Sequence, residues 1–315
     1  MMFSVLGAGV AGLCVATALA ERGARVEVID RDPDPTGASW YAGGMLAPFC
    51  EGEAAPDEVV TRGQAARDWW AARVPGVIRH CTLVVAPARD AAELDRFARA
   101  TRGHAWVDPG AVEPDLAGRF ARGLFFADEA HLDPRAATRA LIAGLRARGV
   151  DLLFGTGAVP RGQVIDCRGM AARDHLPDLR AVRGEMLILR SPDITLSRPV
   201  RLLHPRFACY VVPRGAGLFM VGATMIESDR DGPITARSAM EILSAAYTVH
   251  PGFAEAELVE TGAGLRPALP DNIPRVIHRD GRIHVNGLYR HGFLMAPALA
   301  EELAATLFQE VSHAD

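Results

Sequence analysis

The sequence predicts a protein of mixed α/β and α+β class, with a Rossmann-like domain joined to a second domain built on an antiparallel sheet. The first thirty residues alternate strand, glycine-rich turn, helix and strand, which is the order of a parallel-sheet unit. The second half contains short aliphatic and β-branched runs bounded by Gly and Pro, which is typical of antiparallel strands. A chain of 315 residues is long enough for both domains.

The opening unit is expected to consist of a strand at Phe3–Leu6, a helix at Val10–Arg22 and a strand at Arg25–Ile29. Three glycines spaced G-x-G-x-x-G lie between the first strand and the middle of the helix. This pattern alone is weak evidence, but the preceding strand and the small residues along the helix strengthen it. The unit therefore predicts dinucleotide binding.

The three glycines have different tasks in such a unit. Gly7 permits the tight turn, Gly9 lets the backbone approach a pyrophosphate, and Gly12 lets the helix pack closely on the strand. Val10 and Ala11 begin the helix, where free N–H groups and a partial positive charge attract phosphate. We expect all five residues to lie at the nucleotide.

Asp30 follows the glycines by about twenty residues, where a carboxylate accepts hydrogen bonds from ribose hydroxyls. Arg31, the next residue, is also expected to bind the nucleotide cofactor. The alternative for this region is a secretory signal peptide, because the stretch 5–20 is largely apolar. No positively charged segment precedes it, and it is too short to span a membrane. We therefore expect a cytoplasmic protein without a membrane partner.

Composition narrows the function classes further. A formal net charge of −4 leaves no basic surplus to neutralise phosphates, so we expect no nucleic-acid partner. The five cysteines are scattered, without a C-x-x-C pair or metal-ligand spacing, and we expect neither disulfides nor a metal.

The rest of the first half is expected to contain three further helices and two strands of the nucleotide domain. A glycine-rich stretch at Gly37–Pro48 has few charges and reads as a buried loop pressed against a ligand, with a plain surface loop as the alternative. Asp133 and Pro134 are expected as the N-cap and first residue of the third helix. The expected elements are helices at Asp57–Arg73, Arg89–Thr101 and Arg135–Arg148, and strands at Asp151–Phe154 and Val164–Asp166.

The second half is expected to form the antiparallel sheet, covered by a helix at Thr235–Tyr247. The expected strands are Arg183–Leu189, Ala208–Val212, Leu218–Val221 and Glu257–Gly264. A strand at Ile283–Val285 then leads through a glycine-rich turn into a helix from about Gly292 to Glu310. This second helix N-terminus suits an anionic or electron-accepting group.

Five sequence blocks carry a family resemblance over nearly the whole chain, in addition to the N-terminal glycine motif. The chain resembles the glycine oxidases of thiamine biosynthesis, within the family of FAD-dependent D-amino acid oxidases. The blocks are AGGML at 42–46, YVVPR at 210–214, VGATM at 221–225, GLRP at 264–267 and NGLYRHGFLMAP at 286–297.

The resemblance implies a two-domain flavoenzyme with non-covalent FAD. Residues 1–74, 131–178 and 260–315 would form the FAD-binding domain, and residues 75–130 and 179–259 the substrate domain. Asp30 would hold the adenosine ribose. The other implied cofactor contacts, along the pyrophosphate and the flavin, are Ser39, Gly43, Gly44, Met45, Gly264, Arg290, His291, Gly292, Phe293 and Leu294.

The resemblance also implies the substrate site. Arg266 matches the arginine that binds the substrate carboxylate, and Tyr210 matches its hydroxyl partner. Met225 aligns with a wall of the pocket, and Arg290 with a residue close to substrate and flavin. The alternatives stay open: a structural ion pair for Arg266, a core aromatic for Tyr210 and a solvent-directed side chain for Arg290.

The implied activity is oxidative deamination of glycine, with hydride transfer to flavin and release of ammonia and hydrogen peroxide. The imine would supply the thiazole of thiamine, which suggests a functional link to a thiazole synthase. The sequence leaves open small D-amino acids or sarcosine as substrate, a carrier in place of oxygen, a non-catalytic FAD-binding role and a homo-oligomer. Two departures from the family pattern are the short region Phe154–Gly162 and Arg168, which puts the local FAD contacts in doubt.

Overall fold

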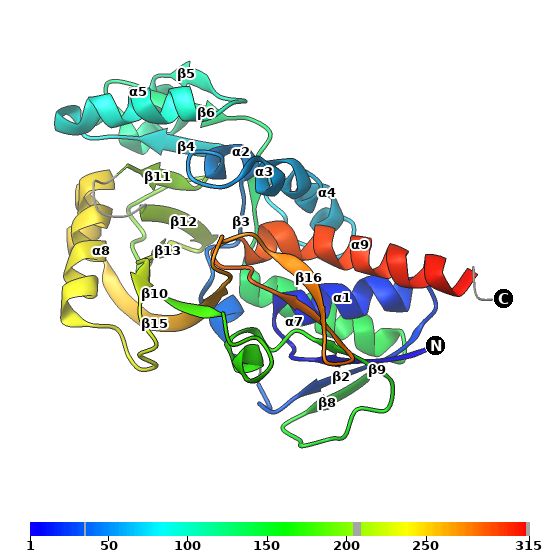
Figure 1. Cartoon of the computed structure of the whole chain (residues 1–315). Helices are drawn as coiled ribbons and strands as arrows, with labels where there is room; N and C mark the ends of the chain where they lie inside the picture. The colour runs from blue at the N-terminus through cyan, green and yellow to red at the C-terminus, as the bar shows by residue number, and fades with distance from the viewer. Residues whose placement is uncertain (35, 204–208, 313–315) are drawn as a thin grey trace.

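Two sheets organise the chain in a computed structural model that describes residues 1–34, 36–203 and 209–312 (Figure 1). Within these ranges the first sheet has six strands in the order β16-β17-β9-β1-β2-β8. Five of them run parallel, and β16 is an antiparallel edge. The strands are β1 (Met2–Leu6), β2 (Arg25–Asp30), β8 (Asp151–Phe154), β9 (Gln163–Asp166), β16 (Arg275–Arg279) and β17 (Arg282–Asn286). This is the Rossmann-like sheet that the sequence predicts.

Three helices pack with this sheet: α1 (Val10–Glu21), α7 (Pro134–Ala147) and α9 (Gly292–Ser312). Helix α1 is buried along nearly its whole length because it lies between the sheet, α7 and α9. Its small residues allow this close packing on all sides. Asp133 caps α7 as expected, since its Oδ1 accepts hydrogen bonds from the amides of Arg135 and Ala136.

The helix predicted at Asp57–Arg73 is wrong as a single element. The structure has two short helices here, α3 (Asp57–Gly63) and α4 (Ala66–Ala71). The chain bends after Gly63, where α9 comes so close that a Cβ on Gly63 would lie 2.7 Å from Leu294 Cγ. The helix predicted at Arg89–Thr101 begins later, as α5 (Ala91–Ala100) after a short 3-10 turn.

The second sheet has nine strands among the residues that the structure describes. It is mainly antiparallel, as predicted, except that β4 and β11 pair in parallel. Helix α8 (Ala236–Val249) packs on β10 to β13 and covers the sheet as expected. Ala208, predicted in a strand, lies outside the described residues. The strands are β4 (Thr82–Val85), β5 (Ala105–Val107), β6 (Gly123–Phe126), β10 (Arg180–Arg190), β11 (Val200–Leu202), β12 (Cys209–Gly215), β13 (Leu218–Gly222), β14 (Ile226–Glu227) and β15 (Glu257–Ala268).

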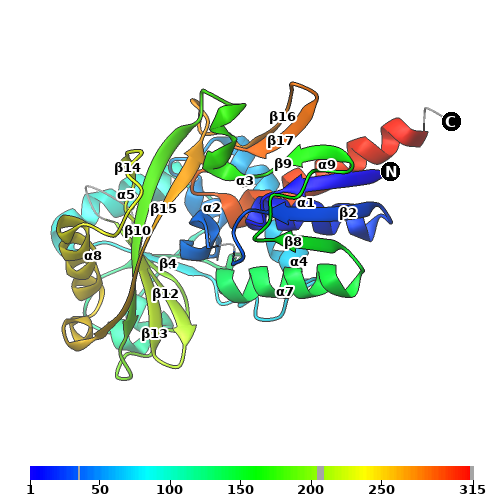
Figure 2. The same ribbon diagram turned by 90° about the horizontal axis from the view of Figure 1, so that it is seen from below.

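Strand β15 connects the two parts of the molecule. It pairs with β10 from Glu257 to Ala268, so the domain boundary expected at residue 260 falls inside a strand of the second sheet. Figures 1 and 2 place α8 at one end of the molecule and α1, α7 and α9 at the other. We propose the domain division of the sequence analysis with the rest of β15 moved to the substrate domain.

Short elements join the two parts. They are α2 (Pro48–Glu51) and a two-stranded sheet of β3 (Met45–Leu46) and β7 (Ala130–His131), while α6 (Pro109–Val112) lies between β5 and β6 of the second sheet. The predicted loop after Gly37 therefore contains β3 and, before it, a 3-10 turn at Ala38–Tyr41.

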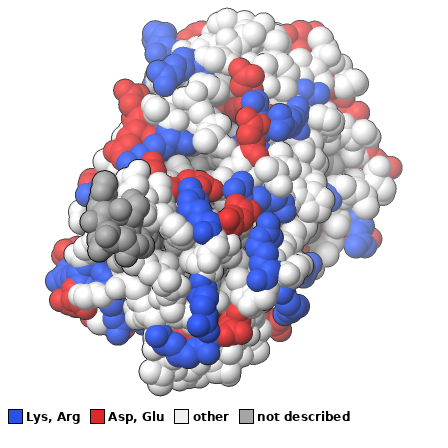
Figure 3. All heavy atoms as spheres, turned by 90° about the vertical axis from the view of Figure 1, so that its right-hand side faces the viewer, with Lys and Arg blue, Asp and Glu red and all other residues white. Residues whose placement is uncertain are grey.

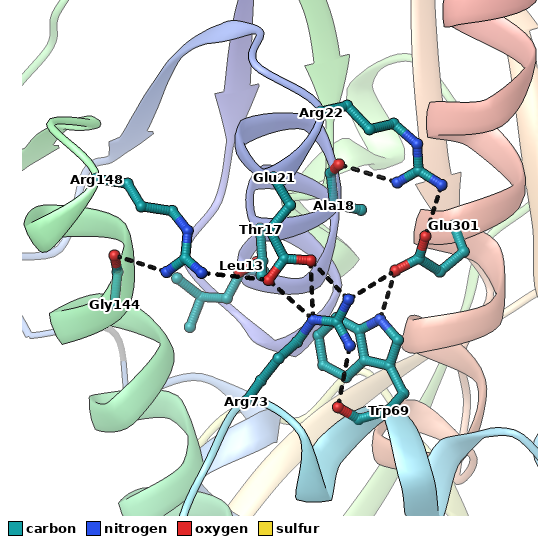
Figure 4. A network of polar contacts seen from close by, with 10 residues as sticks. All are labelled: Leu13, Thr17, Ala18, Glu21, Arg22, Trp69, Arg73, Gly144, Arg148 and Glu301. Atoms are coloured by element: carbon teal, nitrogen blue, oxygen red, sulfur yellow. Dashed lines mark hydrogen bonds and ion pairs between the residues drawn. The ribbon is translucent and has the colours of Figure 1, made fainter.

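An ion-pair network fastens α4 to α1 and α9 (Figure 4). Arg73 Nη2 donates to Glu21 Oε2 at 2.6 Å and to Glu301 Oε1 at 3.2 Å. Trp69 Nε1 donates to the same Glu301 oxygen at 2.7 Å. The buried Trp70 donates from Nε1 to the carbonyl of Phe293 in the first turn of α9. The first turn of α9 is thereby held in place by a hydrogen bond from α4.

Acidic and basic side chains are interspersed on the face around the C-terminal end of the described chain (Figure 3). None of the helices in the described residues is both long and apolar enough to cross a membrane.

Candidate functional site

A cavity of about 740 Å³ is lined by residues of both sheets. Its walls come from the glycine turn before α1, the stretch after Gly37, the segment after β9, strands β10, β12, β13 and β15, and the turn before α9. The predicted site residues that line it are Gly7, Gly9, Val10, Ala11, Asp30, Arg31, Ser39, Gly43, Gly44, Met45, Tyr210, Met225, Gly264, Arg266, Arg290, Gly292 and Phe293. The fold therefore brings residues 7 and 293 to one cavity.

Three predicted cofactor residues, Gly12, His291 and Leu294, do not line the cavity. A Cβ on Gly12 would lie 1.9 Å from the carbonyl oxygen of Gly7, so this glycine permits the turn itself. His291 is buried, with Nδ1 3.5 Å from a carboxylate oxygen of Glu51. Leu294 packs against Gly63. These three residues therefore lie next to residues of the cavity wall without lining the cavity themselves.

The glycine turn is held by the two polar residues that the sequence assigns to the cofactor. Asp30 Oδ2 accepts a hydrogen bond from the amide of Ala8 at 2.6 Å, and Ser39 Oγ accepts one from Val10 at 3.1 Å. Gly7 has a φ of +95°, and a Cβ there would lie 2.7 Å from the carbonyl oxygen of Cys167, the residue after β9. The turn, the start of α1 and a carboxylate thus form a cradle that suits a ribose and a pyrophosphate.

The glycine pair at the middle of the cavity is positioned by Arg214, which sequence reasoning missed. Arg214 Nη1 donates to the carbonyl of Leu132 at 3.0 Å, and its Nη2 donates to the carbonyl of Gly43 at 2.9 Å. Gly44 has a φ of +69°, and a Cβ there would lie 2.2 Å from the same Leu132 oxygen. Only glycine fits, and its backbone becomes part of the cavity wall.

Arg168, the departure from the family pattern, also lines the cavity. Its guanidinium is paired with two carboxylates: Nη2 lies 2.6 Å from Asp166 Oδ2 and 2.8 Å from Asp174 Oδ1. Its charge is therefore compensated by the last residue of β9 and by the segment that follows this strand. The arginine stabilises this wall through local ion pairs and adds no unpaired charge of its own to the cavity.

Arg266 differs from Arg168 in having no carboxylate within 4.0 Å among the described residues. Its Nη1 donates to the carbonyl of Thr224 at 2.9 Å. Burial lowers the pKa of Arg266 to about 10, so the guanidinium is charged at pH 7. A Cβ on Gly184 would lie 2.1 Å from Arg266 Nη2, so the guanidinium lies directly over this glycine. The cavity contains a positive charge that a ligand can neutralise.

Glu51 is the main functional residue that sequence reasoning missed. It is the last residue of the one-turn helix α2 and lines the cavity. Its Oε1 accepts a hydrogen bond from the Tyr210 hydroxyl at 2.9 Å, and its Oε2 lies 2.9 Å from Arg290 Nη2. Burial would raise the pKa of Glu51, but the charges of Arg290, His291 and Arg201 outweigh it and lower this pKa to about 2.

Glu51 therefore holds two of the predicted substrate residues together. The side chain of Arg290 turns to this carboxylate, and its Nη1 also lies 3.7 Å from the sulfur of Met225. Met225 is 38% exposed at the cavity. The one available signal was an acidic residue a few positions after the glycine stretch, and sequence alone does not distinguish it from neighbouring acids.

The cavity is chemically asymmetric. One end has helix amides and glycine backbone, which suit phosphates and a flat ring. The other end has the guanidinium of Arg266, which has no carboxylate partner in the described part of the chain, and the anionic Glu51 with its partners. In the described residues no group of three or more His, Cys, Asp or Glu side chains could hold a metal ion.

Comparisons with known proteins agree with this geometry. The family model "FAD dependent oxidoreductase" matches residues 3–306. A Rhizobium etli protein that carries the name thiamine biosynthesis oxidoreductase ThiO is 57% identical over 98% of this chain and 97% of its own length. A glycine oxidase of Bacillus licheniformis is 26% identical over 95% of this chain and 91% of its own. The crystal structure of a glycine oxidase from Bacillus cereus superposes with a TM-score of 0.83 at 21% identity, covering 98% of this chain and 95% of that one.

Proposed function

Because the chain belongs to the family of FAD-dependent oxidoreductases, we propose that it oxidises glycine, with oxygen as the electron acceptor. The products are the imine or glyoxylate, ammonia and hydrogen peroxide, and the imine supplies the thiazole of thiamine. Its similarity to a relative named for thiamine biosynthesis and to a glycine oxidase supports this substrate. The proposal includes non-covalent FAD, a cytoplasmic location and a functional link to a thiazole synthase.

The single observation that carries the proposal is the uncompensated charge of Arg266. A guanidinium that has no carboxylate within 4.0 Å in the described chain, and that lines a cavity, calls for an anion from outside. The carboxylate of an amino acid fits the guanidinium in a bidentate pair. This pair would fix the substrate's orientation and leave its Cα and amine toward the rest of the cavity.

The chain's own residues support the cofactor, and the nearby His291 does not line the cavity. FAD, when bound, supplies the acceptor for the hydride that leaves the substrate Cα. The amides at the starts of α1 and α9 and the backbone of Gly43 and Gly44 would hold it. Burial lowers the pKa of His291 to about 4, so its imidazole is neutral at pH 7. We assign no obligatory protein acid or base.

Glu51 positions two side chains at the substrate end of the cavity. By accepting a hydrogen bond from the Tyr210 hydroxyl and pairing with Arg290, it holds both side chains in the cavity wall that also contains Arg266. Glycine, sarcosine and small D-amino acids differ here by a methyl or a side chain, a difference worth only about 1–3 kcal/mol. Sarcosine or a small D-amino acid therefore remains the second candidate substrate on the same site.

The visible spectrum of the purified FAD-loaded protein tests the proposal under anaerobic conditions. Glycine, D-alanine and sarcosine are added in separate cuvettes, and air is then admitted while peroxide is measured. The proposal requires the fastest flavin bleaching with glycine and peroxide release in air. Bleaching only by D-alanine or sarcosine would show that the substrate is the second candidate and not glycine. Bleaching without peroxide would indicate a carrier-linked dehydrogenase, and a protein that takes up no FAD would refute the proposal.

A further inference from the structure

A fully buried arginine lies beneath the substrate end of the cavity. Arg201, on β11, is 2% exposed, and it is not among the residues that line the cavity. It is the register partner of Tyr210 on β12, and its Cζ lies 5.2 Å from the centre of the Tyr210 ring. On another side its Cζ lies 4.7 Å from the centre of the Phe97 ring. Two aromatic faces thus enclose the cation.

The guanidinium of Arg201 holds the C-terminal end of α2. Its Nη1 donates to the carbonyl of Cys50 at 2.9 Å and contacts the sulfur of the same residue at 3.5 Å. Its Nη2 donates to Glu53 Oε2 at 3.2 Å. Cys50 directly precedes Glu51 and Glu53 follows it by two residues, so Arg201 binds the backbone carbonyl before this carboxylate and a side-chain carboxylate after it.

A buried carboxyl group holds the same short helix from its N-terminal side. Glu129 is 0% exposed, and its Oε1 accepts a hydrogen bond from the amide of Cys50 at 2.7 Å. This amide is one of the donors that a helix start leaves without a partner inside the helix. Arg201 and Glu129 therefore satisfy the carbonyl and the amide of one residue from opposite sides.

Helix α2 needs such support because it is a single turn. A helix of this length does not maintain itself, and the side chain of its N-cap residue provides no hydrogen bond. The placement of Glu51 relative to Tyr210 and Arg290 must then come from contacts between α2 and the second sheet. The contacts described above supply this placement from β11 and from the residue before β7.

We propose that Arg201 is a positioning residue for substrate binding. It acts through the Cys50 backbone and the Tyr210 ring to fix Glu51, and Glu51 in turn keeps Tyr210 and Arg290 at the substrate. The inference rests on the proposed function for its kinetic consequence, but its structural part is independent of the substrate.

The test compares the FAD-loaded wild type with Arg201→Lys and Glu53→Gln. Lysine retains the charge but cannot reach Cys50 and Glu53 together as a planar fork does. Glu53→Gln removes the charged partner of the Arg201 guanidinium but keeps the arginine itself. It is therefore the second test variant if Arg201→Lys fails to fold. Arg198→Lys is the matched control, because Arg198 is also mostly buried just before β11 and bonds to Glu113 and the carbonyl of His80, neither of which belongs to α2.

Two measurements are made on each protein. The first is amide hydrogen exchange of the peptide that contains α2, which requires no substrate. We expect faster exchange at residues 48–53 in Arg201→Lys and Glu53→Gln but not in Arg198→Lys. The second is the KM for glycine, which we expect to rise about tenfold with a smaller change in kcat.

The outcomes separate this inference from the proposed function. Unchanged exchange at α2 in both folded variants would overturn the positioning role, whatever substrate the enzyme uses. Faster exchange with an unchanged KM would also overturn it, because Arg201 would then be structural only. A wild type that does not oxidise glycine would refute the proposed function, and the exchange comparison would still decide whether Arg201 holds α2.

Discussion

The guanidinium of Arg266 lies across the backbone of Gly184. The two residues belong to neighbouring antiparallel strands, β15 and β10, and a Cβ on Gly184 would come within 2.1 Å of Arg266 Nη2. The strand pairing sets this arrangement, with Gly184 opposite Gly264, two residues before the arginine. A residue without a side chain on β10 therefore determines where the positive charge of the cavity is placed.

Gly184→Ala is predicted to displace the Arg266 guanidinium without unfolding the protein, because the obstructed atoms are the end of a flexible side chain. We expect the KM for glycine to rise about tenfold or more, since the carboxylate partner moves from its place. Kinetics and a thermal melt check this. Gly157→Ala is the control, because no atom lies within 4 Å of the added Cβ. Equal kinetics for the two variants would contradict the relationship.

Arg266→Ala is predicted to remove most carboxylate recognition. A hydrogen bond to a charged group is worth roughly 1.5–3 kcal/mol, so loss of a bidentate pair should raise the KM well over tenfold. Steady-state kinetics and titration with acetate measure the effect. Arg168→Ala is the comparison, because that guanidinium also lines the cavity but is already paired with Asp166 and Asp174. Unchanged binding in Arg266→Ala would remove this residue from the site.

Glu51→Gln is predicted to leave Arg290 without its carboxylate partner. The substrate end would then contain two uncompensated guanidinium groups, so we expect tighter inhibition by acetate together with a lower kcat/KM for glycine. Inhibition constants at low ionic strength check this. Glu93→Gln, an exposed acid on α5 that pairs with Arg96, is the control for a general loss of negative charge. Weaker acetate inhibition in Glu51→Gln would show that Glu51 does not compensate Arg290.

Ionisation of Glu129 should make the free energy of unfolding decrease as the pH rises. Burial raises the pKa of Glu129 to about 8, against about 4.3 in an unfolded chain. The folded state therefore binds more protons between these values, and the contribution to stability is complete below pH 4.3 and lost as the pH rises through 8. Glu129→Gln should remove on the order of 4 kcal/mol of this decline between pH 5 and 8.5.

Urea unfolding of wild type and Glu129→Gln at several pH values measures this difference. Glutamine retains an acceptor for the Cys50 amide, so the comparison isolates the ionisation. The histidines act in the opposite direction: burial lowers the pKa of His131 to about 3 and that of His291 to about 4, so both favour the folded state as the pH rises toward 6.5. Parallel pH profiles for the two proteins would contradict the prediction.

Elements with a local signal could be predicted from the sequence with good boundaries. The strand, turn and helix around Gly7 and the capped helix after Asp133 each depend on conformations encoded within a few residues. The break after Gly63 was not predictable in this way, because it depends on the approach of α9 from the far end of the chain. The parallel pairing of β4 with β11 also joins segments more than a hundred residues apart.

The sequence by itself determined the nucleotide-binding unit, the class of the two domains and, by resemblance, the residues to examine at the cofactor and substrate. Glycine spacing, helix caps and alternating apolar runs act through backbone conformation, which neighbouring residues decide. Only the tertiary structure decided which charges are paired. It paired Arg290 with Glu51, and among the described residues it left Arg266 over Gly184 without a carboxylate within 4.0 Å. Electrostatic compensation depends on distances between side chains brought together by folding, and sequence spacing does not contain those distances.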